Sequence, residues 1–452
     1  MAKSKSSSNT SLPHSPAETV VSRTSSNLAD EKQMNPWDGY ENDEMPEKVQ
    51  PRLVRNLRLQ AFSIYRRFFS VVFITNMGIF ISYAIRGYNS QKVALLAVSN
   101  LFIAILMRQE LVINTLFAVA CAVPQSWPFW IRKLAARVYH NGGVHSGAAV
   151  SGTVWLILLS VQATRELVNN KGYIILAFLT SIVIFAHPTL RVKRHDTFER
   201  VHRFMGWTAT ALVWSQVRTM SSLLTNDHRG ERTLGAALVH SAPFWLDDCS
   251  ELLAHPSLGE TAEGPRLRAS FLSNHAVQAS PHPVPGSFQR FSTDPLNEWH
   301  SFATIAIPGK TGFSIIISQA GDWSTEMITN PPKEIWVRGM PTCGLLRIVP
   351  LFRRVLFVAT GSGIAPFTPH IMSGKIDHKL FWMAPNTQNS PGAIVYDTRK
   401  HGKPDIIKLT HSLVDEFKPE CVCVISNQKL TEKVIYGLRS RGMLAFGAIF
   451  DS

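Results

Sequence analysis

Val355 to Phe367 reads VLFVATGSGIAPF, and this stretch decides how the C-terminal part of the chain is interpreted. Its apolar half is a run of the kind that forms a buried strand in a parallel sheet. A Gly-Ser-Gly turn follows, and Pro366 stands where a helix is expected to open. Such glycines let the backbone approach a phosphate at the start of a helix. Because glycine pairs are also common in plain tight turns, the stretch indicates a nucleotide site only together with the segments before it.

The composition divides the chain into two halves. Its 452 residues leave room for two or three domains, and long apolar runs fill only the first half. The net charge is +14, but Arg and Lys gather at the ends of apolar runs without a stripe of basic and aromatic residues. We therefore expect the lipid bilayer as a partner, and no nucleic acid. The five cysteines form no CxxC pair, so we expect reduced thiols and neither a disulfide framework nor a metal finger.

Residues 1–50 are rich in Ser, Asn, Pro and acidic residues, which predicts a disordered N-terminal tail without a signal peptide. Residues 51–250 are predicted to form an α-helical membrane domain of about six spans. Basic residues crowd alternate loops, which places the N-terminus and the C-terminal domains of this multi-pass protein in the cytosol. The expected spans are Phe68 to Ile85, Val93 to Met107, Gly143 to Ala163, Gly172 to Ala186, about Val201 to Met220, and Thr233 to Leu246.

Two of these assignments leave alternatives. Leu111 to Val123 either continues the second span or forms an interfacial helix after it, and we favour the interfacial helix. Thr233 to Leu246 is shorter than a bilayer usually requires. We include it because a sixth span keeps the C-terminal domains on the side where nicotinamide nucleotides occur. It is either a short tilted or buried span, or a local anomaly of this sequence.

The C-terminal half predicts a β-barrel followed by an α/β domain. Short alternating segments separated by Pro and Gly turns indicate an antiparallel β-barrel over residues 265–345. Apolar runs near Ile335, Val355, Lys379 and Val422, with helical stretches between them, indicate a doubly wound parallel sheet, with the α/β domain at 346–452. The barrel segments are Ala269 to Val277, Ser287 to Ser292, His300 to Ile307 and Phe313 to Gln319.

Four motifs follow one another in this half. They are Trp299-His300-Ser301-Phe302-Ala303-Thr304-Ile305, Gly321-Asp322-Trp323-Ser324, Val337-Arg338-Gly339-Met340-Pro341 with Gly344, and Thr360-Gly361-Ser362-Gly363-Ile364-Ala365-Pro366. In order and spacing they resemble the W-H-P-F-T-I, G-D-W-T, V-D-G-P-Y-G and G-G-I-G-V-T-P motifs of the ferric reductase and NADPH oxidase superfamily. With the closing run Phe446 to Asp451, the combination looks most like the fungal TmpA-type membrane flavoproteins.

The resemblance implies a ferredoxin-reductase-like module with two cofactor sites. FAD would be held by His300, Ser301, Phe302 and Thr304, and by Gly321, Asp322, Trp323 and Ser324. NADPH or NADH would lie over Thr360, Gly361, Ser362, Gly363, Ile364, Ala365 and Pro366. The structural alternatives are an ordinary barrel strand with a stray histidine, and a helix that Asp322 merely caps.

The sequence also departs from that family. The arginine that selects NADPH is missing, since its place reads Phe381 to Asn386, so the choice between NADH and NADPH stays open. The family's C-G-P motif is replaced by Cys423 to Asn427. Cys423 is either that cysteine shifted in register or a thiol of the core.

Two histidines of the predicted spans bear on electron transfer. His145 opens the third span and His202 the fifth, and alternate spans run in the same direction, so both lie at the cytosolic depth. They are suited to ligate one b-type heme iron through both axial positions. The alternative is that they hydrogen-bond at the interface. The positions where the family carries its outer ligands hold Leu158 or Leu159 and Ser215 or Gln216, so at most one heme is expected.

These features favour a membrane-bound oxidoreductase. It would pass electrons from NAD(P)H through FAD, with or without one heme, to an unknown acceptor; the cofactors perform the redox chemistry, so no catalytic acid or base is assigned. One alternative is a cytosol-facing NAD(P)H oxidoreductase that reduces a small lipophilic metabolite without heme. Another is a signalling or scaffold protein with degenerate cofactor sites.

Overall fold

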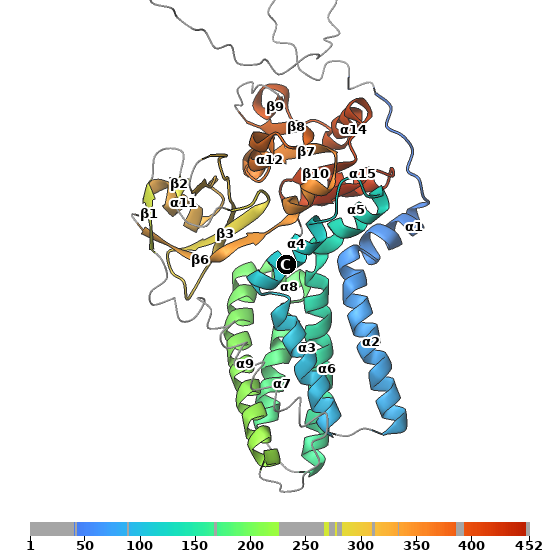
Figure 1. Ribbon diagram of the computed structural model, residues 1–452, viewed down its shortest axis with the longest axis vertical. Helices are drawn as coiled ribbons and strands as arrows, with labels where there is room; N and C mark the ends of the chain where they lie inside the picture. Colours follow the sequence, from blue (N-terminus) through green and yellow to red (C-terminus); the bar gives the residue numbers. More distant parts are fainter. Residues whose placement is uncertain are drawn as a thin grey trace, which may run out of the picture.

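The computed structural model has two tiers, a lower one of helices and an upper one of two sheets (Figure 1). Within the described residues, long helices that lie alongside one another form the lower tier: α2 (Ile64–Arg86), α3 (Ser90–Leu106), α6 (Gly142–Glu166), α7 (Asn170–Phe185) and α9 (His195–Thr225). The described residues are 40, 43–87, 90–166, 170–225, 266–270, 276–277, 283–309, 312–332, 334–385 and 393–448.

The number of helices able to cross a membrane is lower than predicted. In the described part of the chain, α2 and the segment Gly142–Leu159 of α6 are long and apolar enough, and a third candidate arises if the bent pair of α3 and α4 (Glu110–Cys121) counts as one span. The expected count of about six is therefore not supported. α7 contributes only a shorter apolar stretch, and α9 carries charged residues in its first turns. Thr233 to Leu246 lies outside the described residues.

The interior of the helical tier is polar at one level and closely packed at another. The Asn76 side-chain oxygen accepts hydrogen bonds from Asn100 Nδ2 and Trp155 Nε1, both at 2.8 Å, which joins α2, α3 and α6. Nearer the sheets, a Cβ on Gly143 would collide with the backbone oxygen of Tyr65. Small residues thus let α6 approach α2 closely.

The first sheet closes into a barrel. Its strand order is β4-β3-β6-β1-β2-β5, and each of these neighbouring pairs is antiparallel. Ile305, just beyond β4, exchanges backbone hydrogen bonds of 2.8 and 2.9 Å with Ser314 of β5, so the two edges of the sheet meet. The strands are β1 (Arg266–Ser270), β2 (Ala276–Val277), β3 (Ser287–Ser292), β4 (His300–Ala303), β5 (Phe313–Ser314) and β6 (Glu334–Cys343); α11 (Asp322–Thr329) packs on them.

The second sheet is parallel, in the order β11-β10-β7-β8-β9. The prediction of a parallel sheet through Val355, Lys379 and Val422 is confirmed. The run at Ile335 is a correction, because it belongs to β6 of the barrel and pairs with β1. The strands are β7 (Arg354–Thr360), β8 (Asp377–Ala384), β9 (Ala393–Asp397), β10 (Cys421–Ile425) and β11 (Ala445–Gly447).

Alternate residues of the central strands enter two separate cores. Leu356 and Val358 face the helices α14 (Ile406–Phe417) and α15 (Gln428–Arg439). Val355 and Phe357 face the opposite core, where the sheet meets Phe117 of α4. Cys423 is fully buried in this second core, as expected of a core thiol. The remaining elements near the sheet are η3 (Leu345–Leu351), η4 (Gly361–Ile364), α12 (Thr368–Ser373) and α13 (Thr398–His401).

A segment between α3 and α6 joins the two tiers. α4 is a separate helix that bends away from α3 by 74°, and it is followed by α5 (Phe129–Ala135) and η2 (Ala136–His140); its place at a membrane interface stays a prediction. Arg132 of α5 forms a bidentate ion pair with Glu420, with N–O distances of 2.6 and 2.8 Å. The Asn114 side-chain oxygen of α4 accepts a hydrogen bond from the backbone N–H of Cys343 at 2.7 Å. This segment therefore docks against both sheets.

A second connection comes from the start of the chain. Residues 43–61, which we call the strap, run along α15 and end in α1 (Arg52–Asn56) and the π-helix η1 (Leu57–Ala61) before α2 begins. Residues 43–50 of the strap belong to the tail predicted from the sequence. The short helix α8 (Pro188–Lys193) precedes α9.

Candidate functional site

The candidate site begins where the order of the parallel sheet reverses. β7 is followed in sequence by β8 on one side, whereas its other neighbour is β10. In open α/β sheets, ligands bind in the crevice at the carboxyl ends of the two strands that flank such a switch point. Here the hydroxyls of Thr360, at the end of β7, and Ser426, just after β10, lie 2.5 Å apart.

Each glycine of the turn after β7 has a different role. Gly361 has φ +53°, in the left-handed region, and a Cβ there would meet open space. Its carbonyl accepts a hydrogen bond of 2.9 Å from Trp382 Nε1, which fixes the turn. Gly363 has no room for a side chain, because a Cβ would lie 2.5 Å from the backbone oxygen of Ile425. The turn therefore needs glycine at both positions, once for conformation and once for packing.

The backbone after Gly361 differs from the predicted helix. Ser362, Gly363 and Ile364 form a 3-10 turn, and Ala365 and Pro366 continue in a turn, so that α12 begins only at Thr368. Pro366 thus precedes the helix rather than opening it.

Aromatic rings gather in the predicted flavin motifs. The His300 ring of β4 stacks on Trp323 of α11 with centroids 4.1 Å apart, and Phe302 stacks on the same indole at 5.8 Å. His300 Nε2 lies 3.2 Å from a carboxylate oxygen of Glu298. Ser301 is exposed on the same strand. Two motifs separated by about twenty residues of chain are thereby brought into one cluster, as a shared cofactor site requires.

Other residues of these motifs have local structural roles. Thr304 is buried, and its hydroxyl bonds with the Ser287 hydroxyl at 2.8 Å. Ser324 accepts hydrogen bonds from the N–H groups of Ala320 and Gly321, both at 2.9 Å. The start of α11 is therefore capped by Ser324, whereas Asp322 is exposed in its first turn.

The two predicted cofactor sites meet. Ser318, which lies just before the Gly321 motif, has its hydroxyl 3.0 Å from the hydroxyl of Ser362 in the glycine turn. Ser318, Trp382 and Ser426 are not among the site residues predicted from the sequence. Ser426 was open to prediction, because the rule on the carboxyl ends of parallel strands applies to every strand of the sheet.

The third motif lies in strand β6, and Gly344 follows directly after it. Gly339 has φ +52°, and a Cβ there would clash with the carboxylate of Glu110 from α4. Arg290 of β3 pairs with the same carboxylate at 3.0 Å. Burial, and then the charge of Arg290, lower the pKa of Arg338 to about 10. This motif helps to join the barrel to the helical tier.

The two histidines of the predicted spans lie close to each other. The rings of His145 and His202 have centroids 6.4 Å apart. His145 Nδ1 lies 2.7 Å from the carbonyl oxygen of Ala104, an acceptor that keeps the proton on Nδ1 and leaves Nε2 with its lone pair. Among the described residues there is no group of three or more His, Cys, Asp or Glu suited to a metal ion.

Comparisons with known proteins point to one group of reductases. Residues 345–452 match the family described as the C-terminal domain of adenylate-forming reductase 03009. The chain is 49% identical to adenylate-forming reductase 03009 of Coprinopsis cinerea over 93% of its own length and 43% of that protein. It is also 49% identical to adenylate-forming reductase 06235 of the same fungus, over 95% and 44%. The chain thus spans less than half of the length of the curated relatives it matches.

A solved structure offers a weaker likeness. The ferredoxin NADP+ reductase of Neisseria gonorrhoeae with bound FAD and NADP aligns with 40% of this chain and 95% of its own, at 14% identity and a TM-score of 0.32. A TM-score this low does not establish a common fold. The resemblance to ferric reductases and TmpA-type proteins stays a prediction.

Proposed function

We propose that this chain is an NAD(P)H-dependent flavin oxidoreductase whose helical tier holds it in a membrane. The observation that carries the proposal is the contact between Ser318 and Ser362, because it brings the flavin motifs and the nucleotide turn within one hydrogen bond. Transfer between two cofactors requires that their reacting atoms be held close together. Both curated relatives are named reductases, which supports the same class of reaction.

Residues of the crevice fit a nicotinamide dinucleotide. The open space above Gly361 leaves room for a phosphate beside the backbone, and the Thr360 and Ser426 hydroxyls lie next to it. Backbone and hydroxyl groups at such a turn are the usual partners of a diphosphate. NADPH and NADH are both compatible with these contacts, because none of the contacts involves the ribose 2′ position.

The ring cluster fits FAD. His300, Trp323 and Phe302 present stacked rings beside the exposed Ser301. Flavin, when bound there, accepts a hydride and releases electrons singly or in pairs. The residues of this chain orient the ring system and the diphosphate, while Thr304 and Ser324 hold the supporting strand and helix in place.

The histidine pair fits one b-type heme. His145 and His202, whose ring centroids lie 6.4 Å apart, are the residues that would hold a single heme iron. The hydrogen bond from His145 to Ala104 is the kind that orients a ligating imidazole. The heme would supply one-electron transfer toward an acceptor, as in the ferric reductase type.

An absorbance spectrum of the purified full chain tests the proposal. With FAD supplied, we expect a flavin band near roughly 450 nm that bleaches on addition of NADPH or NADH. Trp323→Ala should lower the flavin content, whereas the matched variant Trp130→Ala, whose indole is 66% exposed on α5, should not. A stable preparation without flavin absorbance would refute the proposal.

The same spectrum decides whether heme is bound. A Soret band that is lost in His145→Ala and in His202→Ala supports heme-mediated transfer. Flavin without a Soret band favours an oxidoreductase that reduces a lipophilic metabolite directly. Absence of both the flavin band and the Soret band favours a signalling or scaffold role.

A further inference from the structure

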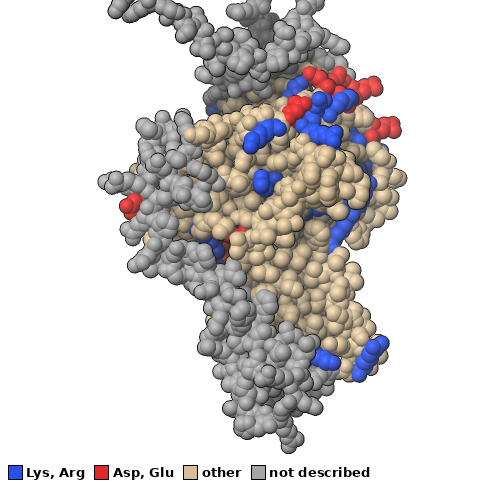
Figure 2. All heavy atoms as spheres, in the orientation of Figure 1, with Lys and Arg blue, Asp and Glu red and all other residues tan. Residues whose placement is uncertain are grey.

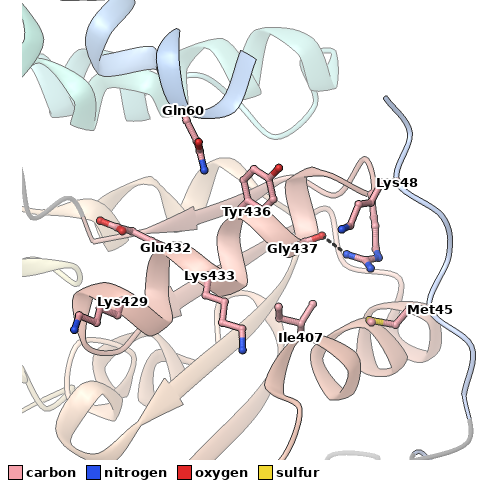
Figure 3. A pocket seen from close by; sticks show the side chains of 10 residues that line it. Met45, Lys48, Gln60, Ile407, Lys429, Glu432, Lys433, Tyr436 and Gly437 are labelled. Atoms are coloured by element: carbon pink, nitrogen blue, oxygen red, sulfur yellow. Dashed lines mark hydrogen bonds between the residues drawn. The ribbon is translucent and has the colours of Figure 1, made fainter. Parts of the chain in front are cut away.

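A pocket of about 570 Å³ lies on the far side of α15 from the core of the parallel sheet, between that helix and the strap (Figure 3). Met45, Lys48 and Gln60 line it from the strap. Residues of α14 and α15 form the opposite wall. None of the described residues that line this pocket belongs to the crevice or to the ring cluster, so the pocket is a separate site.

The walls of the pocket are fixed by hydrogen bonds between distant parts of the chain. The Val49 N–H donates to the carbonyl oxygen of Ser440 at 3.0 Å. Arg55 Nε donates to the Tyr436 hydroxyl at 2.9 Å, and that hydroxyl donates to Asn56 Oδ1 at 2.6 Å. Arg55 is 8% exposed, although it is an arginine on a short helix. The strap is therefore held in one position on α15, and the pocket is a built feature.

Positive charge dominates the lining. Lys48 comes from the strap, Lys429 and Lys433 from α15, and Arg441 from the turn after it, against one carboxylate, Glu432. Lys429 and Lys433 are four residues apart and so share one face of the helix, where two like charges repel each other. An anion between them would remove this repulsion.

Acidic residues offset only part of the four positive charges of the lining. Glu432 is engaged by the Gln428 side chain at 3.0 Å. Three exposed carboxylates of the strap, Asp43, Glu44 and Glu47, lie outside the lining. The charge that a bound molecule meets in the pocket is thus positive.

The basic surface continues from the pocket toward the first helix of the lower tier. Arg52 and Arg58 are exposed on α1 and η1, and Arg66 and Arg67 are exposed in the first turn of α2. Figure 2 shows Lys and Arg on the upper tier and at the lower tip, with uncharged residues over the visible described face of the helices between them. Clusters of Lys and Arg just before a membrane helix attract anionic lipid headgroups.

We propose that this pocket binds a ligand that carries phosphate monoester groups, of the kind found in phosphorylated inositol headgroups. Lysine acts as a point charge for phosphate, and three lysines and one arginine surround a volume large enough for a small ring with several phosphates. A cationic ligand would meet like charge in the pocket. The lipid-linked form and the soluble form share this chemistry.

The test uses the full chain and two probes. Soluble inositol 1,4,5-trisphosphate is titrated into detergent-purified protein, and nanodiscs of phosphatidylcholine with or without phosphatidylinositol 4,5-bisphosphate are compared by the thermal unfolding midpoint. We expect the double variant Lys429→Ala/Lys433→Ala to weaken binding about thirtyfold, since each lysine contributes about a factor of five or more. Both lysines are exposed, so the fold should persist.

The matched control is Lys375→Ala/Lys403→Ala, two exposed lysines of the same domain that do not line the pocket. It should change binding less than twofold. Binding of the soluble probe supports a soluble phosphate ligand, and a response confined to the lipid-containing nanodiscs supports a lipid headgroup. No response to either probe, or equal loss in the control variant, would overturn the proposal.

Discussion

The parallel sheet and helix α2 use the same kinds of apolar residue in opposite ways. Val355 and Phe357 of β7 are 0% exposed, whereas Ile74, Ile81 and Ile85 of α2 are 66%, 58% and 79% exposed. In the sheet, burial of apolar surface stabilises the fold directly. In α2, the apolar surface points away from the protein. Its stability therefore depends on what surrounds the helix, and we propose that this is lipid.

The two regions also differ in the polarity of their interiors. The sheet is apolar on both faces, but the helical tier places Asn76, Asn100 and Trp155 at its centre, all at most 8% exposed. Where the surroundings are as apolar as the side chains, hydrophobic burial no longer drives helices together, and packing and hydrogen bonds between helices take over. The comparison predicts that the same substitution has different effects in the two regions.

Phe357→Ala should give the largest effect. Its ring stacks on Phe367 with centroids 4.7 Å apart and has no exposed surface, so truncation should lower the free energy of unfolding by about 3–5 kcal/mol. Ile74→Ala on α2, whose side chain faces away from the protein, should change it by less than about 0.5 kcal/mol in detergent or lipid. Chemical denaturation of both variants measures the difference. Equal effects would mean that α2 is covered by protein.

Loss of the Arg132 side chain should give the next largest effect. Arg132→Ala leaves the Glu420 carboxylate without its two-pronged partner and the carbonyl of Leu351 without its donor, at an expected cost of about 3 kcal/mol. The control is Arg354→Ala, whose ion pair with Asp377 is about half exposed and should contribute about 0.5 kcal/mol. Limited proteolysis of the chain between α5 and β7 would show whether the helical tier separates from the sheets. An effect of Arg132→Ala no larger than that of the control would contradict the docking role.

Acid should weaken the parallel-sheet domain through His370. Burial lowers the pKa of this histidine from 6.5 to about 4, so between these values the unfolded chain binds a proton that the folded chain does not. Stability is therefore complete above about pH 6.5 and falls by about 3 kcal/mol toward pH 4. His370→Gln should flatten this dependence in denaturation curves recorded across the window. A matched variant, His401→Gln, should retain it.

Asn76→Leu should give the smallest effect. It removes the acceptor shared by Asn100 and Trp155, which we expect to cost about 1–2 kcal/mol for helices in an apolar environment. The readout is the unfolding midpoint of the protein in bicelles. Thr208→Val, at an exposed position of α9 where the hydroxyl bonds only within its own helix, serves as the control. An Asn76→Leu protein as stable as this control would mean that packing alone holds α2, α3 and α6 together.

Several parts of the fold were predictable because their signals are local. The run Val355 to Val358 has the length and residue types of a buried strand, and the glycines after it mark the turn. The apolar stretch of α2 likewise predicts a long helix from local sequence alone. Ile335 was assigned to the wrong sheet because an apolar run does not specify its partner strand. Its pairing with β1 depends on the closure of the barrel.

The number of spans was the least predictable quantity. Hydropathy recovers helices, but α3 ends at Leu106 and the chain bends by 74° before α4, which then packs on the sheets. No local feature of Leu111 to Cys121 distinguishes a helix covered by lipid from one covered by protein. Phe117 is 2% exposed because the parallel sheet lies against it.

The stretch VLFVATGSGIAPF by itself determined a strand, a turn and the need for glycine, since these follow from side-chain shape and backbone freedom within a few residues. Only the tertiary structure placed Ser426 beside Thr360 and Ser318 beside Ser362. Each of these pairs joins segments more than forty residues apart. Their distances are set by how strands and helices pack, which no short stretch of sequence encodes alone.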